Sequence, residues 1–531
     1  MKLASSLVAL PVMLSLLTAA GCASDAEPAA AVAPVEGVPV TGDEDDLTSN
    51  TALSRNIDFV GVVYVSAAAG EQEIISAVNA QCKTGFGPLR NAKAVPNTRE
   101  LKNADPASFK RTVVEVVDTL NGNAVTKMLR VSYRYKDIAV VDKSYAYRSS
   151  IPLAVLGKDA QSQSDRVYRE CTDNSEHTRE YPLWYEFEPS RSSCRAAISA
   201  EQTAIDAERR KLTSKKTQVS KLEAERLYLP ITVKIGPDKT NKGASYPEYH
   251  RLFSGGVEAG KLVIGLVNGT IDDDKPEITD DSGYSDWTDE LEALAGVRPF
   301  AIVATDPPAD FSAFKVGNKT LSNPTLQNIV DLNNGRLAGY DDAEQRELKK
   351  LVGAKLARRW ITLEAPVTVR IGSAEPKAVT FKVQTYFGAD SNAAVYKRAI
   401  KTSDVFIYNG HSYIGSGPLD SSRFTKDDFP ASYQILFIDG CVSYNYYEKD
   451  YIPLKEGGTK NLDLITNGIE APSYQSGYAL GEFLSAMLSG KQPSYRDLLT
   501  AAEATDSLRV VDGEVDNVYS PAKQPIQVDD R

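Results

Sequence analysis

Residues 405–415, VFIYNGHSYIG, and residues 435–441, ILFIDGC, decide the fold that we expect for this chain. Each stretch is an apolar run that continues into Asn-Gly or Asp-Gly, and His411 or Cys441 comes next. Uninterrupted apolar runs of this length are typical of strands that are buried on both faces of a parallel sheet. Ligands bind in α/β proteins at the carboxyl ends of such strands. We therefore expect His411 and Cys441 to lie a few ångströms apart at neighbouring strand ends.

Similar patterns extend on both sides of these two stretches. Apolar runs such as KLVIGLVNG, PFAIVAT, AVTFKVQTYFG and LDLITNG alternate with helical patterns such as DDAEQRELKKLVGAKLARRW, SNAAVYKRAIK and GYALGEFLSAMLSG. Alternation of this kind predicts an α/β domain with a largely parallel sheet flanked by helices. We place this domain at residues 228–510 and expect residues 511–531 to be a C-terminal tail.

The N-terminal half has a different pattern. Alternating apolar and polar residues in IDFVGVVYVS, RTVVEVVD, KMLRVSYRY and DIAVVD predict a mostly antiparallel, strand-rich domain over residues 56–195. Residues 196–227 carry apolar side chains every seven positions among charged residues, without Gly or Pro. This segment predicts one long helix that connects two domains or lies on the body, since the flanking charges argue against a strong coiled coil.

The first residues are those of an export signal. Residues 1–21 combine Lys2, an apolar stretch and small residues before Cys22, which indicates a signal peptide. The small-residue run that ends at Cys22 resembles a lipobox, in which this cysteine carries lipid; cleavage by an ordinary signal peptidase is the alternative. Residues 22–55 are rich in Ala, Pro, Gly and acids, which predicts a flexible tether to a membrane. The resemblance places the chain in a bacterial cell envelope, with the outer membrane favoured over the inner one.

Export makes disulfides possible among the remaining cysteines. Cys171 and Cys194 flank a polar, aromatic loop that a disulfide between them would close, although sequence alone does not show that they approach each other. Cys82 is then expected to be a small buried residue. Cys441 is left unpaired, which is unusual in an oxidising compartment and calls for a chemical explanation.

The composition excludes some classes of function. A net charge of −11 and a pI near 5.1 argue against nucleic-acid binding. The acidic stretch TIDDDKPEITDDSGYSD lacks the spacing of a calcium-binding loop and is expected to be solvated. The chain has three histidines, of which His177 and His250 lie in polar surroundings and are interpreted as surface residues. We therefore expect no zinc site, no other metal site and no cofactor.

The two quoted stretches, taken with the strand–helix unit before them, resemble the caspase-like cysteine peptidases, which include gingipain, clostripain, legumain, metacaspase and separase. The resemblance covers about residues 370–500 and implies a three-layer α/β fold. It also implies that Cys441 attacks the carbonyl of a protein or peptide substrate, that His411 acts as the base, and that the backbone N–H groups of Ser412 and Cys441 bind the oxyanion. A thiolate near an imidazole suits this chemistry.

Two departures from the family pattern concern neighbouring positions. Ser412 stands where glycine is commoner, and Gly440 stands where alanine is commoner. The local sequence Q-A-C-x-G that is special to caspases themselves is absent. By resemblance to clostripain and the metacaspases, Asp439 is expected to line the pocket for an Arg or Lys before the cut bond. Asp439 can alternatively accept hydrogen bonds from backbone N–H groups nearby.

The sequence thus predicts a membrane-tethered cysteine endopeptidase. The alternative from a different class is a catalytically inactive lipoprotein of the same fold that acts as a binding or assembly module. Ser412 and the large N-terminal half are the features that favour the alternative.

Overall fold

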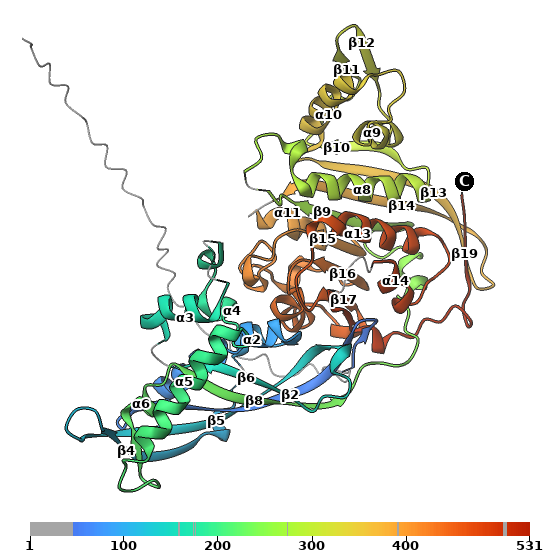
Figure 1. Ribbon diagram of the computed structural model, residues 1–531. Coiled ribbons are helices and arrows are strands. Elements are labelled where there is room, and N and C mark those ends of the chain that lie inside the picture. The colour runs from blue at the N-terminus through green and yellow to red at the C-terminus, as the bar shows by residue number, and fades with distance from the viewer. Residues whose placement is uncertain are drawn as a thin grey trace, which may run out of the picture. The chain divides into compact units, whose positions relative to one another are not determined.

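The computed structural model describes residues 46–102, 104–157, 160–173, 175, 177–272, 274–389, 392–502 and 507–530 (Figure 1). The signal peptide, Cys22 and most of the predicted tether lie outside these residues. A ten-stranded sheet forms the C-terminal part of the chain. In spatial order its strands are β1 (Thr48–Ser49), β18 (Arg509–Asp512), β17 (Leu462–Asn467), β16 (Gln434–Asp439), β15 (Val405–Asn409), β9 (Lys261–Gly269), β14 (Lys377–Ala389), β13 (Trp360–Ile371) and β10 (Ala301–Asp306), with β19 (Ile526–Asp530) also paired to β13.

The middle of this sheet is parallel. Strands β17, β16, β15, β9 and β14 pair in parallel, and the strands outside them pair antiparallel. The chain starts the parallel block at β9, adds β14 on one side, and then adds β15, β16 and β17 on the other. The direction of strand addition therefore reverses between β9 and β15, which is the point where α/β sheets bind ligands.

Strands β15 and β16 are mostly apolar and every residue in them is buried, because both faces of the sheet are covered there. Val405 and Ile407 of β15 pack in one core, whereas Phe406 and Tyr408 pack in the other, as the alternation of side chains along a strand requires. Helices α8 (Ser282–Val297), α10 (Asp342–Leu356), α13 (Ser473–Leu488) and α14 (Tyr495–Ala501) contribute to the first core, and α11 (Ala393–Lys401) contributes to the second.

Helices α8 and α13 run side by side (Figure 1). Gly477 makes this contact possible, because a Cβ atom there would lie 2.3 Å from the Cα atom of Asp286 on α8. Any larger residue would separate the two helices. The close contact brings Asp286 beneath the carboxyl ends of the parallel strands, where its side chain accepts a hydrogen bond of 3.0 Å from Asn409.

A second sheet of seven strands forms most of the N-terminal part. Its strands are β6 (Ser150–Leu156), β8 (Tyr228–Asp238), β2 (Ala52–Ser66), β5 (Ala124–Asp142), β4 (Lys110–Asp118) and β7 (Gln218–Ser220), with β3 (Ala94–Pro96) paired to β5. All pairs except β4 with β7 are antiparallel, as the sequence predicts. Two of the expected strands, KMLRVSYRY and DIAVVD, are parts of the single strand β5.

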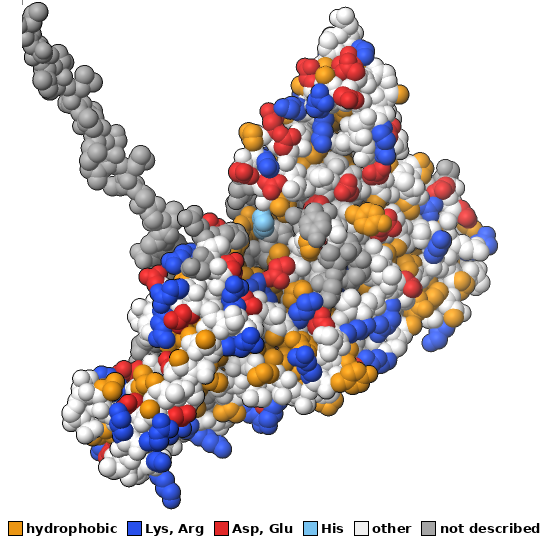
Figure 2. Space-filling view, viewed as in Figure 1, with side chains coloured by type: hydrophobic (Ala, Val, Ile, Leu, Met, Phe, Trp, Pro, Cys, Tyr) orange, Lys and Arg blue, Asp and Glu red, His pale blue; other side chains and the backbone are white. Residues whose placement is uncertain are grey.

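The N-terminal part also contains the helices α1 (Glu71–Lys83), α2 (Phe86–Asn91), α3 (Ser164–Cys171), α4 (Leu183–Glu186), α5 (Ser192–Arg209) and α6 (Lys221–Ala224). One hydrophobic core contains side chains from both sheets, including Val140 of β5, Phe86 of α2 and Leu436 of β16. Charged side chains of both signs appear over the face drawn in Figure 2.

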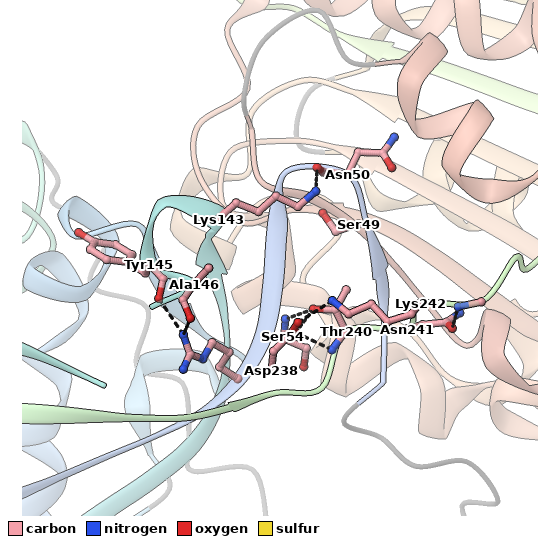
Figure 3. A network of polar contacts seen from close by, with 12 residues as sticks. Ser49, Asn50, Ser54, Lys143, Tyr145, Ala146, Asp238, Thr240, Asn241 and Lys242 are labelled. Atoms are coloured by element: carbon pink, nitrogen blue, oxygen red, sulfur yellow. Dashed lines mark hydrogen bonds and ion pairs between the residues drawn. The ribbon is translucent and has the colours of Figure 1, made fainter. Parts of the chain in front are cut away.

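The predicted tether ends earlier than residue 55. Strand β1 pairs with β18 at the edge of the large sheet, and Leu47, Thr48 and Ser49 are buried. Lys143 donates to the carbonyl oxygen of Asn50 in the network that surrounds this segment (Figure 3). The backbone groups of Thr48 and Ser49 pair with those of Val511 and Val510 in β18. This partner strand lies more than 400 residues away in the sequence, so no local pattern indicates the pairing.

Two other expected boundaries are also wrong. Residues 511–531 are no separate tail, since β18 includes Asp512 and β19 adds to the sheet beside β13. Strand β8, which we assigned to the α/β domain from residue 228 onward, pairs with β2 and β6 and therefore belongs to the N-terminal sheet.

The helix expected over residues 196–227 is shorter. Helix α5 ends at Arg209, and a loop, β7 and α6 follow. The side chain of Gln218 closes this loop by accepting hydrogen bonds from the backbone N–H groups of Thr213 and Ser214. The hydroxyls of Thr213 and Thr217 donate further hydrogen bonds, to Gln218 and to Ser214. These local bonds stabilise the loop, and the helix does not continue through it although the apolar residues keep their spacing.

Candidate active site

His411 and Cys441 follow neighbouring strands at equivalent positions. Strands β15 and β16 are parallel, and the last residue pair in register is Asn409 with Asp439. His411 and Cys441 each come two residues after this pair. Since β15 adjoins β9 at the reversal of strand order, both residues lie at the edge of the sheet where a ligand is expected.

His411 is held by the first loop of the parallel block. Its Nε2 atom lies 3.0 Å from the carbonyl oxygen of Ile271, just after β9. A carbonyl oxygen only accepts hydrogen bonds, so Nε2 carries the proton and Nδ1 of the neutral ring is left as the basic nitrogen. Tyr408 fixes the same loop, because its hydroxyl donates a hydrogen bond of 2.8 Å to the carbonyl oxygen of His411.

Cys441 is unpaired and half-buried, unlike Cys82, which is fully buried. The Sγ atom of Cys441 lies 3.9 Å from the carbonyl oxygen of Ala471. Burial raises the pKa of the Cys441 thiol; the carboxylates of Glu470 and Asp439 add to this rise, whereas the hydrogen bond to Ala471 and the charge of Arg90 oppose it. Within the described residues no hydrogen bond joins Cys441 to His411, so the two residues are neighbours in the sheet without forming a closed pair.

The backbone is strained beside both residues. Tyr413 and Ile414 after His411 have φ angles of 48° and 52°, and Val442 after Cys441 has a φ angle of 54°. Positive φ is costly for residues with a branched Cβ such as Val and Ile. A π-helical turn over Tyr444–Glu448 follows Val442. Backbone strain and π-helical turns both occur preferentially at functional sites.

The two departures from the family pattern fit each other sterically. A Cβ atom on Gly440 would lie 2.5 Å from the Oγ atom of Ser412 and 3.2 Å from the carbonyl oxygen of Gly410. Ser412 therefore occupies the space that an alanine methyl group at position 440 needs. Among the described residues, neither the Ser412 N–H nor the Cys441 N–H donates a hydrogen bond to the protein, so both remain open to an oxyanion.

Asp439 differs from its expected role. Its carboxylate is fully buried and accepts hydrogen bonds of 2.6 Å from Asn467 and from Arg509 of β18. Asp439 lies on the face of Phe437, whereas Cys441 packs against the opposite core. The alternation of side chains ends with β16 because the chain turns at Gly440. Asp439 is thus held inside the protein through Oδ1, and its buried Oδ2 atom has no hydrogen-bond partner among the described residues.

A segment of the N-terminal half forms one wall of the site. Cys171 and Cys194 are joined by a disulfide with their Cα atoms 4.6 Å apart. The closed segment carries Tyr181 and Tyr185, whose stacked rings have centroids 5.8 Å apart. The hydroxyl of Tyr185 lies 3.5 Å from a carboxylate oxygen of Glu470, and Glu470 directly precedes Ala471, whose carbonyl oxygen contacts the Cys441 sulfur. The disulfide therefore holds aromatic side chains near the candidate nucleophile.

The loop after Cys441 is joined to the same half of the chain. Asn445 donates hydrogen bonds of 2.7 Å and 3.1 Å to the carbonyl oxygens of Pro96 and Thr98. Asn97 donates one of 3.0 Å to Glu448. Sequence patterns gave no sign of these contacts, nor of the Ile271 carbonyl that orients His411, because they depend on how distant segments pack.

Other candidate features lie elsewhere. A largely apolar cavity of about 500 Å³ beside α1 is lined by residues that include Ala77, Leu156, Leu183 and Trp184. His250 contacts Glu248 at 3.1 Å and stacks on Tyr519, so it has partners that we did not expect. Within the described ranges, no group of three or more His, Cys, Asp and Glu side chains is arranged to hold a metal ion. In the same ranges no helix is long and apolar enough to cross a membrane.

Comparisons of this chain with protein-family models, with curated proteins and with solved structures find no match.

Proposed function

We propose that this protein is a cysteine endopeptidase of the caspase-like kind. The observation that carries the proposal is the parallel register of β15 and β16, which ends in His411 and Cys441 at equivalent positions beside the reversal of strand order. The strained backbone that follows each of these residues supports the same function.

In the proposed reaction, Nδ1 of His411 takes the proton of the Cys441 thiol, and the sulfur attacks the carbonyl carbon of a peptide bond. The N–H groups of Ser412 and Cys441 bind the oxyanion, and the protonated His411 gives its proton to the leaving amine. Water then hydrolyses the thioester and regenerates the thiol. Because burial raises the pKa of Cys441, the thiol is protonated in the resting protein and needs His411 as its base.

Hydrolysis of a peptide library by the protein tests this proposal. Wild type should cleave, and Cys441→Ala should not, with His411→Ala reduced by about a hundredfold or more. Cys82→Ala is the matched control because, among the described residues, it removes the other free thiol, which lies outside the site. Equal turnover by wild type and Cys441→Ala would exclude the proposal.

A binding module is the second candidate, and the apolar cavity beside α1 favours it. A cavity of this size suits a small apolar ligand. On this account Cys441 is inert, and Trp184 fluorescence should report ligand binding that Cys441→Ala leaves unchanged. Absence of turnover together with such binding would favour the module over the peptidase.

The membrane anchor is also a proposal. We propose that Cys22 carries lipid and holds the protein in a bacterial envelope membrane, with the outer membrane favoured. The support is the sequence of small residues before Cys22. Cys22→Ser should release the protein from the membrane fraction and lower its mass; unchanged fractionation and mass would refute the anchor.

A further inference from the structure

Arg90 of α2 lies beside the candidate nucleophile and comes from the N-terminal half of the chain. Its guanidinium forms an ion pair with Glu470 and lies over the Tyr185 ring, 4.0 Å from the ring centroid. One of its nitrogens donates a hydrogen bond of 3.4 Å to the carbonyl oxygen of Tyr185. Its Nε atom is buried and has no hydrogen-bond partner among the described residues. The contacts therefore hold Arg90 in place but leave one of its donors unsatisfied.

Glu470 belongs to the loop that follows β17, on the other side of Cys441 from His411. It directly precedes Ala471, whose carbonyl oxygen contacts the Cys441 sulfur. The side chain of Glu470 is 49% exposed, whereas that of Arg90 is 12% exposed. The carboxylate of Glu470 thus remains accessible from solvent even while Arg90 contacts it.

The position of Glu470 matches the geometry of acyl transfer at Cys441. His411 must face the leaving amine in order to protonate it, so the leaving group lies on the β15 side of the sulfur. The residue that supplies the attacked carbonyl then extends away from His411, towards the β17 side, where Glu470 lies. A carboxylate beside an aromatic ring is the combination that binds a guanidinium best, through an ion pair and through stacking.

We propose that Glu470 and Tyr185 form the subsite for an arginine or lysine side chain of the substrate, and that Arg90 occupies this subsite in the structure described here. The inference rests on the proposed peptidase function, and it replaces Asp439 with Glu470 as the acidic residue that selects the substrate. A substrate must displace Arg90 in order to bind. The N-terminal half therefore competes with the substrate for one carboxylate.

Calorimetric binding of Nα-benzoyl-arginine amide to proteins that carry Cys441→Ala tests the subsite without any turnover. Adding Arg90→Gln should tighten binding by about tenfold because the competing guanidinium is gone. Adding Glu470→Gln should abolish the preference for benzoyl-arginine amide over its uncharged citrulline analogue. Arg99→Gln is the matched control, since Arg99 forms an ion pair of 3.1 Å with Asp420 at the same junction without contacting Glu470.

Arg99→Gln should bind as its parent protein does. Equal affinity with and without Arg90→Gln, or an arginine preference that survives Glu470→Gln, would overturn the subsite. Hydrolysis of paired arginine and citrulline peptides by the proteins that retain Cys441 separates this inference from the proposed function. Turnover without an arginine preference removes the subsite and keeps the peptidase, whereas arginine binding that depends on Glu470 without any turnover keeps the subsite and removes the peptidase.

Discussion

At the scale of single residues, the side chains that fit at positions 412 and 440 depend on each other. Each departs from the pattern of the family that the chain resembles. The Ser412 hydroxyl occupies the space that a methyl group on residue 440 would need, and Gly440 leaves that space free. Alanine at position 440 beside Ser412 would overfill the space between the two residues. Glycine at both positions would leave a void there. The pair therefore gives no reason by itself to regard the site as degenerate.

Gly440→Ala tests this coupling. The added methyl group would overlap the Ser412 hydroxyl, so we expect a loss of about 1–3 kcal/mol in the free energy of unfolding. Ser412→Gly combined with Gly440→Ala should recover most of that loss, because the methyl group then has space. Urea unfolding of the two single variants and the double variant measures the coupling; additive losses would show that the two positions are independent.

Asp439 and Arg509 form a buried ion pair, so removing one partner leaves the other charge uncompensated. Asp439→Ala should lower the free energy of unfolding by about 3–5 kcal/mol. Asp420→Ala, which breaks the more exposed pair with Arg99, should cost about 1 kcal/mol or less. If Asp439→Ala left stability intact and instead altered substrate preference, Asp439 would be the specificity residue after all.

At the scale of elements, the disulfide is the feature that holds Tyr181 and Tyr185 near Cys441. It closes a segment with a sequence separation of 23 residues, so replacing both cysteines by alanine should cost about 3 kcal/mol. Loosening this segment should also let iodoacetamide reach Cys441 faster than in wild type. An unchanged alkylation rate in a folded Cys171→Ala, Cys194→Ala protein would show that the segment does not cover the site.

The parallel strands were the part of the fold that the sequence predicted best. β15, β16 and β17 are buried on both faces, so each is a mainly apolar stretch, and each ends at Asn-Gly or Asp-Gly. Strand β13 was missed because its residues follow helix α10 almost directly, and β1 was missed because its partner β18 lies far away in the sequence.

For the site as well, the sequence predicted the features that depend on local patterns and missed those that depend on distant segments. The positions of His411 and Cys441 depend on local strand ends, which sequence patterns reveal. The partner of Asp439 is on β18, and the partner of Glu470 is on α2. These contacts arise from packing between segments that no local pattern connects, so the sequence did not indicate them.

At the scale of the whole molecule, buried carboxyl groups should make stability depend on pH. Burial is the main cause that raises the pKa of Asp286 and that of Asp463 to about 7 from 3.8. The folded protein therefore binds more protons than the unfolded chain between about pH 4 and pH 7, and the free energy of unfolding falls as pH rises through this range.

We expect the protein to be more stable at pH 5 than at pH 8 by at least about 1 kcal/mol. Asp286→Asn should reduce this difference, since the amide keeps an acceptor for Asn409 and cannot ionise. Urea unfolding at the two pH values measures both effects. A higher stability at pH 8, or the same pH dependence in Asp286→Asn, would show that these carboxyl groups are ionised in the folded protein.

The central claim is that Cys441 is a nucleophile whose reactivity depends on His411. Its most direct test is the rate at which an arginyl chloromethyl ketone peptide labels the protein, with mass spectrometry locating the label. The account predicts one label, on Cys441, formed at least about a hundredfold more slowly in His411→Ala and absent in Cys441→Ala. Equal rates in wild type and His411→Ala, or a label on any other residue, would contradict it.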